Sequence, residues 1–363
     1  MFIAGFLLML GPLVTVHELG HYLVGRWCGV KADVFSIGFG KELFGLTDRR
    51  GTRWKVSLLP LGGYVQFAGD MNPASQPTEE WLALPEAERA QTFQAQPLWQ
   101  RALIVVAGPL TNFIVAIAIL GSFAFVYGKA DYPPVVGVMS ESGAAAKAGI
   151  RLGDRIVAVD GDPIDQFDEL AGKFQLSSGE RVTLDISRES KALSFTFVIP
   201  EVVGHDNFGH EYRIGQIGIG PGPGEIVPVG AGEAAVLGVR DTGEIVGTMA
   251  TGLWKIVTGR ISPKELGGPL KIAQFSGEQL SLGWPQFIHF VALVSINLAF
   301  INLLPIPALD GGHLAFYAAE AIRRKPAGAR SQEWAFRTGI ALVLALMLFV
   351  TINDIASLPL FSG

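Results

Sequence analysis

Four long apolar segments constrain this chain more than any other feature. They cover residues 2–24, 102–127, 287–309 and 335–352, and each is long enough to matter, since about 20 apolar residues span a bilayer core as a helix. Only 17% of the 363 residues are charged, whereas a soluble domain usually has about 25%. The chain is therefore predicted to be a multi-pass α-helical membrane protein with four transmembrane helices, and not an ordinary cytosolic enzyme.

The first apolar segment is predicted to be a membrane span rather than a signal peptide. No positive residue precedes it, and no small-residue cleavage site stands before its polar residues. The net charge of −5 argues against a nucleic-acid partner. We therefore expect the lipid bilayer, and no nucleic acid, to surround this part of the chain.

Basic residues in the short loops predict the orientation of the spans. They follow the first segment and separate the third from the fourth: Arg26, Lys31, Lys41, Arg49, Arg50, Arg53 and Lys55, then Arg323, Arg324, Lys325 and Arg330. Loops rich in Lys and Arg stay in the cytoplasm. Both termini and the long segment 128–285 are thus predicted to be extracytoplasmic.

The first apolar segment contains the sequence His17-Glu18-Leu19-Gly20-His21. Residues four apart lie on one face of a helix, so the two imidazoles can bind one zinc ion, and Glu18 can act as the catalytic general base. Polar residues at membrane depth are costly and usually functional. The alternative is that they only reach the cytoplasmic interface, because Arg26 follows five residues after His21.

Two histidines leave zinc short of a third protein ligand. Asp310 is our preferred candidate, because the first and third spans run in the same direction and their ends share the cytoplasmic face of the membrane. Glu42, in the basic loop, and His313 are rival ligands. Pro305 and Pro307, just before Asp310, are predicted to break the helix.

Two asparagines precede these prolines in the third apolar segment. Asn297 and Asn302 could bind freed backbone groups or a substrate carbonyl, or they could simply pack between helices. Together with Pro305 and Pro307 they form one part of the predicted substrate-binding set.

These motifs resemble the site-2 protease family of intramembrane zinc metalloproteases, and most closely the bacterial regulator of sigma-E protease group. His17–His21 is similar to the zinc motif, and residues 302–311 (NLLPIPALDG) are similar to the second motif. Residues 107–113 (AGPLTNF) and 267–269 (GGP) also match. The resemblance implies one zinc ion per chain on His17, His21 and Asp310, with Glu18 catalytic.

The resemblance also implies partners and a location. The substrate would be a single-pass membrane protein, such as an anti-sigma factor, already trimmed by an upstream site-1-type protease. The protein would lie in the bacterial inner membrane, with its active site near the cytoplasmic side. Catalysis would be regulated intramembrane proteolysis.

The segment after the first span is predicted to form a β-hairpin. Residues 34–39 and 54–59 have strand character, and residues 48–51 form the turn. Four glycines in this segment permit close backbone approach and complete the predicted substrate-binding set: Gly38, Gly40, Gly62 and Gly63. The resemblance implies a membrane-associated hairpin that holds the substrate as a strand, and the alternative is a mere connection. A short amphipathic helix is expected around residues 86–93.

Residues 148–161 (AGIRLGDRIVAVDG) resemble a bacterial PDZ domain, which is predicted to be an inserted, extracytoplasmic α+β domain. The predicted peptide-binding loop comprises Ile214, Gly215, Ile217, Gly218 and Ile219. The domain could bind a chain terminus by strand addition or act only as a size filter. Many relatives have two PDZ domains, whereas only one fits here.

The predicted organisation has four parts. Residues 1–127 hold the first two spans and the hairpin, residues 128–222 the PDZ domain, residues 223–285 surface helices and residues 286–363 the last two spans. The predicted function is a zinc-dependent endopeptidase that cleaves transmembrane segments. The alternatives are an inert PDZ-bearing membrane scaffold and a different membrane zinc peptidase.

Overall fold

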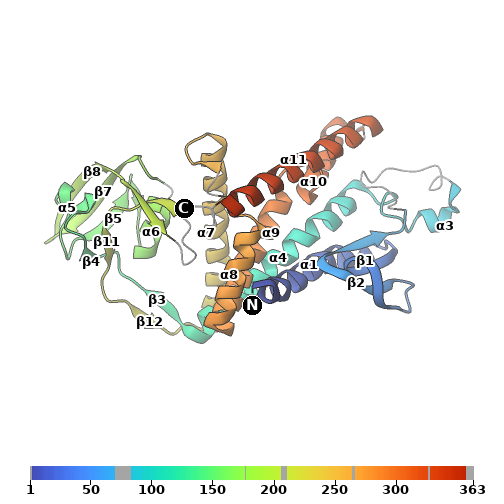
Figure 1. Cartoon of the computed structure of the whole chain (residues 1–363), viewed down its shortest axis with the longest axis horizontal. Helices are drawn as coiled ribbons and strands as arrows, with labels where there is room; N and C mark the ends of the chain where they lie inside the picture. The colour runs from blue at the N-terminus through green and yellow to red at the C-terminus, as the bar shows by residue number, and fades with distance from the viewer. Residues whose placement is uncertain are drawn as a thin grey trace. The chain divides into compact units, whose positions relative to one another are not determined.

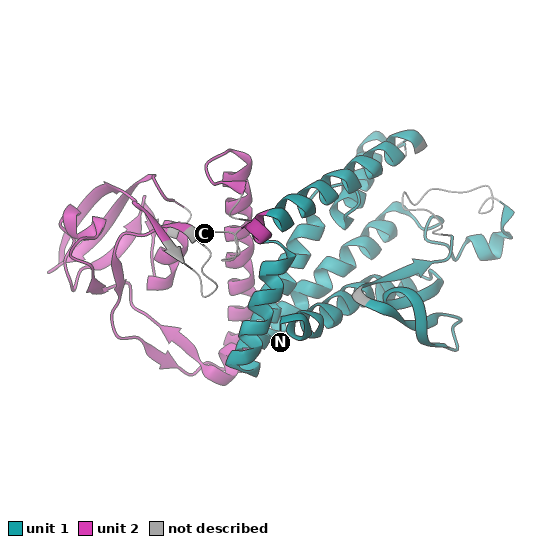
Figure 2. Ribbon diagram, viewed as in Figure 1, with its two compact units in different colours: residues 1–120, 267–352 teal, residues 121–266, 353–363 magenta. Residues whose placement is uncertain are grey.

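The computed structural model describes residues 2–69, 83–175, 177–205, 211–263, 266–325 and 328–356. The chain forms two compact units, which are described separately (Figure 2). The first comprises residues 1–120 and 267–352, and the second comprises residues 121–266 and 353–363. Helix α4 is continuous across the boundary at residue 120.

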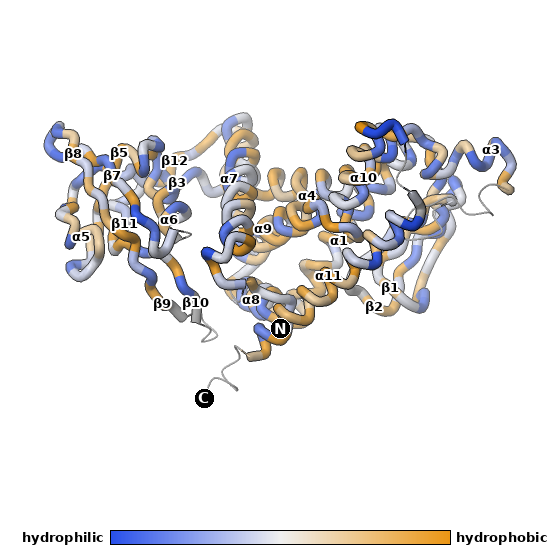
Figure 3. Tube along the Cα trace, turned by 90° about the horizontal axis from the view of Figure 1, so that it is seen from above, coloured by the Kyte–Doolittle hydropathy of each residue, from blue (hydrophilic) through white to orange (hydrophobic). Residues whose placement is uncertain are grey.

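Helices make up most of the first unit (Figure 1). They are α1 (Phe2–Trp27), α3 (Glu86–Arg89), α4 (Leu98–Tyr127), α8 (Pro269–Leu282), α9 (Trp284–Leu303), α10 (Asp310–Arg323) and α11 (Ala329–Ala356). Four of them, α1, α4, α9 and residues 330–356 of α11, are long and apolar enough to cross a membrane. Figure 3 shows the apolar stretches along α4, α9 and α11 in orange. The prediction of four apolar helices is confirmed.

The third apolar helix is shorter than the sequence indicated. α9 ends at Leu303, and residues 304–309 form a non-helical loop. Pro305 and Pro307 explain this end, because proline has no N–H for the helical hydrogen-bond ladder and clashes with the preceding turn. Asp310 therefore does not end the third span, as we expected, but begins the separate helix α10.

The predicted hairpin is present, with longer strands than residues 34–39 and 54–59. β1 (Ala32–Thr47) pairs with β2 (Arg53–Phe67) through a turn at Asp48–Thr52. Residues 34–37 of β1 have partners on both sides, in residues 53–56 and again in residues 63–66 of β2. The end of β2 is therefore the edge of this small sheet.

A cluster of buried side chains attaches the hairpin to α1. Tyr22, Phe35 and Trp54 pack ring against ring, with centroids 4.5–5.7 Å apart, and Phe67 belongs to the same cluster. The helix expected at residues 86–93 is only one turn, because α3 ends at Arg89 and turns follow it. This packing places β2 beside the polar part of α1.

The second unit is built mainly from short strands. They are β3 (Lys129–Asp131), β4 (Val136–Met139), β5 (Arg155–Val159), β6 (Asp162–Pro163), β7 (Arg181–Arg188), β8 (Lys191–Val198), β9 (Glu201–His205), β10 (Glu211–Gly215), β11 (Ile219–Pro221) and β12 (Glu225–Val227). Three helices accompany them: α5 (Ala144–Ala148), α6 (Phe167–Gln175) and α7 (Ala231–Val257). The largest sheet has the order β6-β5-β7-β8, and β11 pairs with β4.

The core of the second unit follows from strand alternation. Val182, Leu184 and Ile186 on β7 are buried, whereas the residues between them are not. They pack with apolar residues of α5, α6 and β5 in one cluster. This α+β core includes side chains from residues 148–161, the segment whose sequence resembles a bacterial PDZ domain.

The predicted peptide-binding loop joins β10 to β11. Ile214 and Gly215 end β10, Ile217 is buried in the core, and Ile219 begins β11. Gly218 has a φ of 82°, a conformation that favours glycine. The carbonyl oxygens of Ile217 and Gly218 accept hydrogen bonds from Ala145 and Ser140, so the loop is held against the start of α5.

Candidate metal centre

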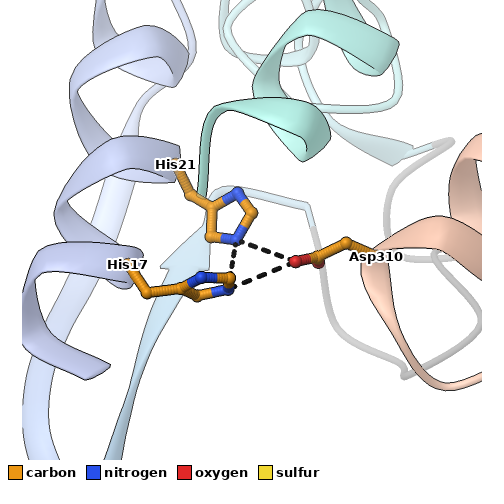
Figure 4. Close-up of side chains that lie close together, drawn as sticks. All are labelled: His17, His21 and Asp310. Atoms are coloured by element: carbon orange, nitrogen blue, oxygen red, sulfur yellow. Dashed lines mark hydrogen bonds and ion pairs between the residues drawn. The ribbon is translucent and has the colours of Figure 1, made fainter. Parts of the chain in front are cut away.

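Three side chains distant in sequence meet in the first unit. His17 and His21 project from successive turns of α1, and Asp310 faces them from the start of α10 (Figure 4). Oδ2 of Asp310 lies 3.2 Å from Nε2 of His17 and 3.6 Å from Nε2 of His21. The two Nε2 atoms are 3.2 Å apart. Among the residues that the structure describes, these three form the one group arranged to hold a metal ion.

The sequence explains why these groups converge. On α1 the buried residues Gly5, Met9, Leu13 and His17 recur every four positions, so His17 continues the packed face of the helix. Asp310 occupies the first helical position of α10, where the positive end of the helix dipole favours a carboxylate. Helix periodicity and a helix start therefore place the three groups together.

Glu18 lies beside this cluster and contacts the hairpin edge. Its Oε2 accepts a hydrogen bond from the backbone N–H of Val65 on β2, at 3.1 Å. A Cβ atom at Gly63 would come within 3.4 Å of Glu18 Cγ. The edge of β2 therefore fixes one carboxylate oxygen of Glu18, a contact that the sequence analysis did not anticipate.

A cavity of about 370 Å³ opens onto the cluster. It is lined by polar groups from three helices and by apolar residues of the hairpin and α4: Val14, His17, Glu18, His21, Val65, Phe67, Phe93, Ile104, Val105, Leu298, Asn302, Ala308, Leu309, Asp310, His313 and Tyr317. It is large enough to admit a few residues of an extended chain. Asn302 is among these lining residues, whereas Asn297 is exposed and is not one of them.

The outer ring nitrogens of both histidines have partners on α4. Nδ1 of His21 lies 2.9 Å from the backbone oxygen of Ile104, and Nδ1 of His17 lies 3.2 Å from Nδ2 of Asn112. Asn112 is fully buried. Residues 107–113 were named from the sequence only because they resemble a family motif. The Gly108-Pro109 pair within an apolar segment is the sequence feature that could have pointed to a close contact here.

Gly108 allows α4 to approach the two imidazoles. A Cβ atom at this position would overlap Nε2 of His21 and would come within 2.9 Å of Cε1 of His17. Both rings therefore rest directly on the backbone of α4. No residue larger than glycine fits there without displacing them.

The loop that carries Asp310 is held equally tightly. Ala308 has a φ of 90°, which is strained for a residue with a Cβ atom. Gly311 and Gly312 lie against the backbone of residues 303–307, and Gly339 of α11 contacts the Pro307 carbonyl so closely that a Cβ atom would overlap it. Backbone contacts from two sides thus set the position of Asp310.

The other predicted residues occupy varied positions. Gly38 (φ 91°) approaches the β2 backbone, Gly40 is open, and Gly62 lies against the Phe39 ring. Pro305 is exposed, and Pro307 lines a small second cavity of about 40 Å³. Of the rival ligands, Glu42 pairs with Arg53 in the hairpin, and His313 lines both cavities without joining the cluster.

Comparison with known proteins places this site in a family. The model of peptidase family M50 matches residues 5–346. The chain belongs to peptidase family M50. The matched range includes His17, His21 and Asp310.

Individual relatives agree over almost their full length. A protein of Agrobacterium fabrum is 44% identical over 362 residues, covering 98% of this chain and 96% of its own. A protein of Rhizobium meliloti is 43% identical and covers 96% and 95%, respectively. Both names describe candidate zinc metalloproteases. Metalloprotease MmpA of Caulobacter vibrioides is 34% identical over 390 residues, with 98% of each chain covered.

A solved PDZ domain also aligns with part of the chain. It is the PDZ domain of the SdrC-like protein of Listeria monocytogenes, which covers 26% of this chain and 92% of its own at 21% identity and a TM-score of 0.21. That score is too low to assign a fold. The M50 assignment rests on the family match and on the long relatives.

Proposed function

We propose that this M50 peptidase is a zinc-dependent endopeptidase of the site-2 type, with one zinc ion held by His17, His21 and Asp310. The observation that carries the proposal is the convergence of two imidazole nitrogens and one carboxylate oxygen within 4.8 Å of one another. Two His and one carboxylate are a usual ligand set of catalytic zinc in peptidases. The names of the relatives agree with zinc.

The residues present fit a cation. Oδ2 of Asp310 is buried and has no well-formed hydrogen bond within the described ranges, although two ring nitrogens lie 3.2 and 3.6 Å away. Buried polar atoms normally have partners. Three acceptor atoms facing one another at this distance are stabilised when a positive ion lies among them. Bound zinc supplies a Lewis acid that polarises a scissile carbonyl.

Glu18 is the proposed general base. The Val65 N–H holds its Oε2 at 3.1 Å, which leaves Oε1 to accept a proton from the attacking water. The hydroxide oxygen bonds to the carbonyl carbon of the substrate. Glu18 then returns the proton to the amide nitrogen as the C–N bond breaks. The carboxylate regains its charge at the end of each cycle.

The edge of β2 is the proposed substrate-binding surface. A transmembrane helix hides its peptide bonds, so it must unwind before it can be cut. We propose that an extended segment adds beside residues 63–67, whose inner side pairs with β1. Because the Val65 N–H is bonded to Glu18, such a segment would lie next to the proposed base. Asn302, in the cavity lining, is the proposed donor to a substrate carbonyl.

The remaining parts of the proposal concern the location of the protein and its substrate. Exposed apolar residues of the hairpin, including Leu43, Phe44 and Leu58, favour contact with lipid. We propose a location in the bacterial inner membrane, with the termini and the PDZ-like unit, by which we mean the strand-rich part of the second unit, outside the cytoplasm. The proposed substrate is a single-pass protein trimmed beforehand by another protease, and the PDZ-like unit either binds its new end or limits its size.

The decisive experiment compares wild type with Glu18→Gln in cells. Gln keeps the shape of Glu but cannot accept the proton, so cleavage should fall by a factor of roughly 10²–10⁴. Zinc content of the purified proteins should stay equal, because Glu18 is not a proposed ligand. Trimmed single-pass membrane proteins should accumulate only in the mutant cells.

Two results would refute parts of this proposal. Unchanged cleavage by Glu18→Gln would remove Glu18 as the base. If the wild-type protein binds zinc but no trimmed membrane protein accumulates in the Glu18→Gln cells, a membrane scaffold would be favoured over a protease.

A further inference from the structure

The turn Gly108–Asn112 of α4 has no part in the reaction described above, yet it lies directly behind both histidines. Gly108 contacts the two imidazoles, and the Asn112 amide reaches Nδ1 of His17. Asn112 is 0% exposed. A buried amide needs hydrogen-bond partners, so its position against a histidine ring is specific.

The ring nitrogens of His17 determine what this contact can do. A neutral imidazole carries a proton on one nitrogen and a lone pair on the other. Nε2 of His17 faces Asp310 and His21 across 3.2 Å each. If Nε2 is to offer its lone pair to a cation there, the proton must be on Nδ1, where an acceptor has to receive it.

The Asn112 side chain is the group that can supply that acceptor. In the structure Nδ2 faces His17, and Oδ1 is buried without a partner in the described part of the chain. Half a turn of the amide exchanges these two atoms without moving any other group, because they have nearly the same size and shape. The amide oxygen then accepts the Nδ1 proton of His17.

We infer that Asn112 is a positioning residue that holds His17 in the Nδ1-protonated tautomer, with Nε2 free to bind the metal. The inference rests on the proposed zinc site. His21 has the equivalent support from the Ile104 carbonyl, at 2.9 Å. That support is backbone, so only the Asn112 contact can be removed by substitution.

A third helix keeps Asn112 in place. Oγ of Ser295 on α9 donates a hydrogen bond of 2.8 Å to the backbone oxygen of Asn112, and both side chains are fully buried. The orientation of His17 is therefore coupled through Asn112 to α9, the helix that leads to Asp310. Asn112 thereby contacts both α1, which carries the histidines, and α9, which precedes the loop before Asp310.

The experiment compares zinc affinity, by chelator competition on the purified full chain, in four proteins. Asn112→Leu keeps the volume and removes the acceptor, so its zinc affinity should fall about 10- to 100-fold. Asn112→Asp keeps an oxygen acceptor and should remain close to wild type. Thr242→Val is the control, since Thr242 is also a buried polar residue and its hydroxyl donates to Gly238 on its own helix, α7.

A spectroscopic measurement separates positioning from simple loss of packing. The visible spectrum of the protein loaded with Co²⁺ should change in Asn112→Leu and stay unchanged in Asn112→Asp and Thr242→Val. Wild-type zinc affinity in a folded Asn112→Leu would overturn the inference. If that variant fails to fold, a folded Asn112→Asp that loses zinc would overturn it equally. A wild-type chain without zinc affinity would instead refute the proposed function.

Discussion

The two units of this chain bury different chemistry. In the second, β-rich unit (residues 121–266 and 353–363) the core cluster is apolar, and its β7 residues follow strand alternation, as Val182, Leu184 and Ile186 do. Asp154, a buried carboxylate of this unit, accepts hydrogen bonds from Arg188. In the first, helical unit, Gly108 lies directly against two imidazoles and Gly339 against a carbonyl group, beside a cluster of polar atoms.

This contrast follows from the solvent that each kind of unit meets. Water drives apolar side chains together, so a water-exposed domain is stabilised by its apolar core. Lipid gives no such driving force, and helices in it are held by close packing of small residues and by polar contacts. We therefore expect a single added methyl group in the helical unit to impair the site, whereas lost charge in the β-rich unit should affect stability alone.

Gly108→Ala should have the largest effect. The new methyl group would overlap His21 and press on His17, so both imidazoles must shift from their positions facing Asp310. Zinc affinity should fall by at least about 100-fold, at the upper end of the losses seen when groups around a metal ligand are changed. Chelator competition and a cleavage assay on the same preparation measure both consequences.

The matched control for Gly108→Ala is Gly11→Ala. Gly11 also lies inside a long apolar helix, α1, but no atom lies within 4 Å of the position of a new Cβ atom there. This variant should bind zinc and cleave as wild type does. If Gly108→Ala and Gly11→Ala bind zinc and cleave equally well, the close approach of α4 at Gly108 does not determine the geometry of the metal site.

The sequence predicted the elements better than their contacts. The spacing of His17 and His21 placed both on one helix face, and the prolines predicted a break in the third span, although we expected that span to reach residue 309. These two features belong to single elements, and sequence periodicity describes one helix or strand at a time. The meeting of Asp310 with the two histidines was predicted from the direction of the spans and not from periodicity.

The contacts that the sequence analysis missed all join separate elements. The Val65 N–H reaches Glu18 because β2 bends, and such a bend leaves no periodic signal. Asn112 meets His17 at a crossing of two helices. Gly339 resembles any other glycine in an apolar segment until α11 is seen to pack against Pro307. Distances between elements depend on tertiary packing, which one sequence does not encode in local patterns.

Gly339→Ala should have an intermediate effect on the site. The added methyl group would overlap the Pro307 carbonyl, so α11 and the loop before Asp310 must separate. The loop is not helical and can yield, so the loss of zinc affinity should be smaller than at Gly108, about 10-fold. Gly328→Ala is the control, because nothing lies within 4 Å of its new Cβ atom. A loss as large in the control as in Gly339→Ala would exclude the contact as its cause.

Removing the charge of Asp154 should have the smallest effect, and this effect should be confined to the stability of the β-rich unit. Burial by itself raises the pKa of this carboxyl, but the Arg188 guanidinium and the Arg151 N–H, at 2.7 Å each, hold the pKa of Asp154 below its ordinary value. A carboxyl with a lowered pKa in the folded state stabilises the fold above its unfolded pKa of about 3.9. That stabilisation is lost as the pH falls below about 4 toward the folded-state pKa.

Asp154→Asn removes the charge and should cost the β-rich unit about 1.5–3 kcal/mol at pH 7, the range for hydrogen bonds to charged groups. Calorimetry of the full chain in detergent at several pH values between 7 and 3 measures this. The wild type should lose stability in the β-rich unit below pH 4 more steeply than the variant does, and zinc affinity at pH 7 should be equal in both. If the variant lost zinc affinity together with stability, the stability of the β-rich unit and the geometry of the metal site would not be independent.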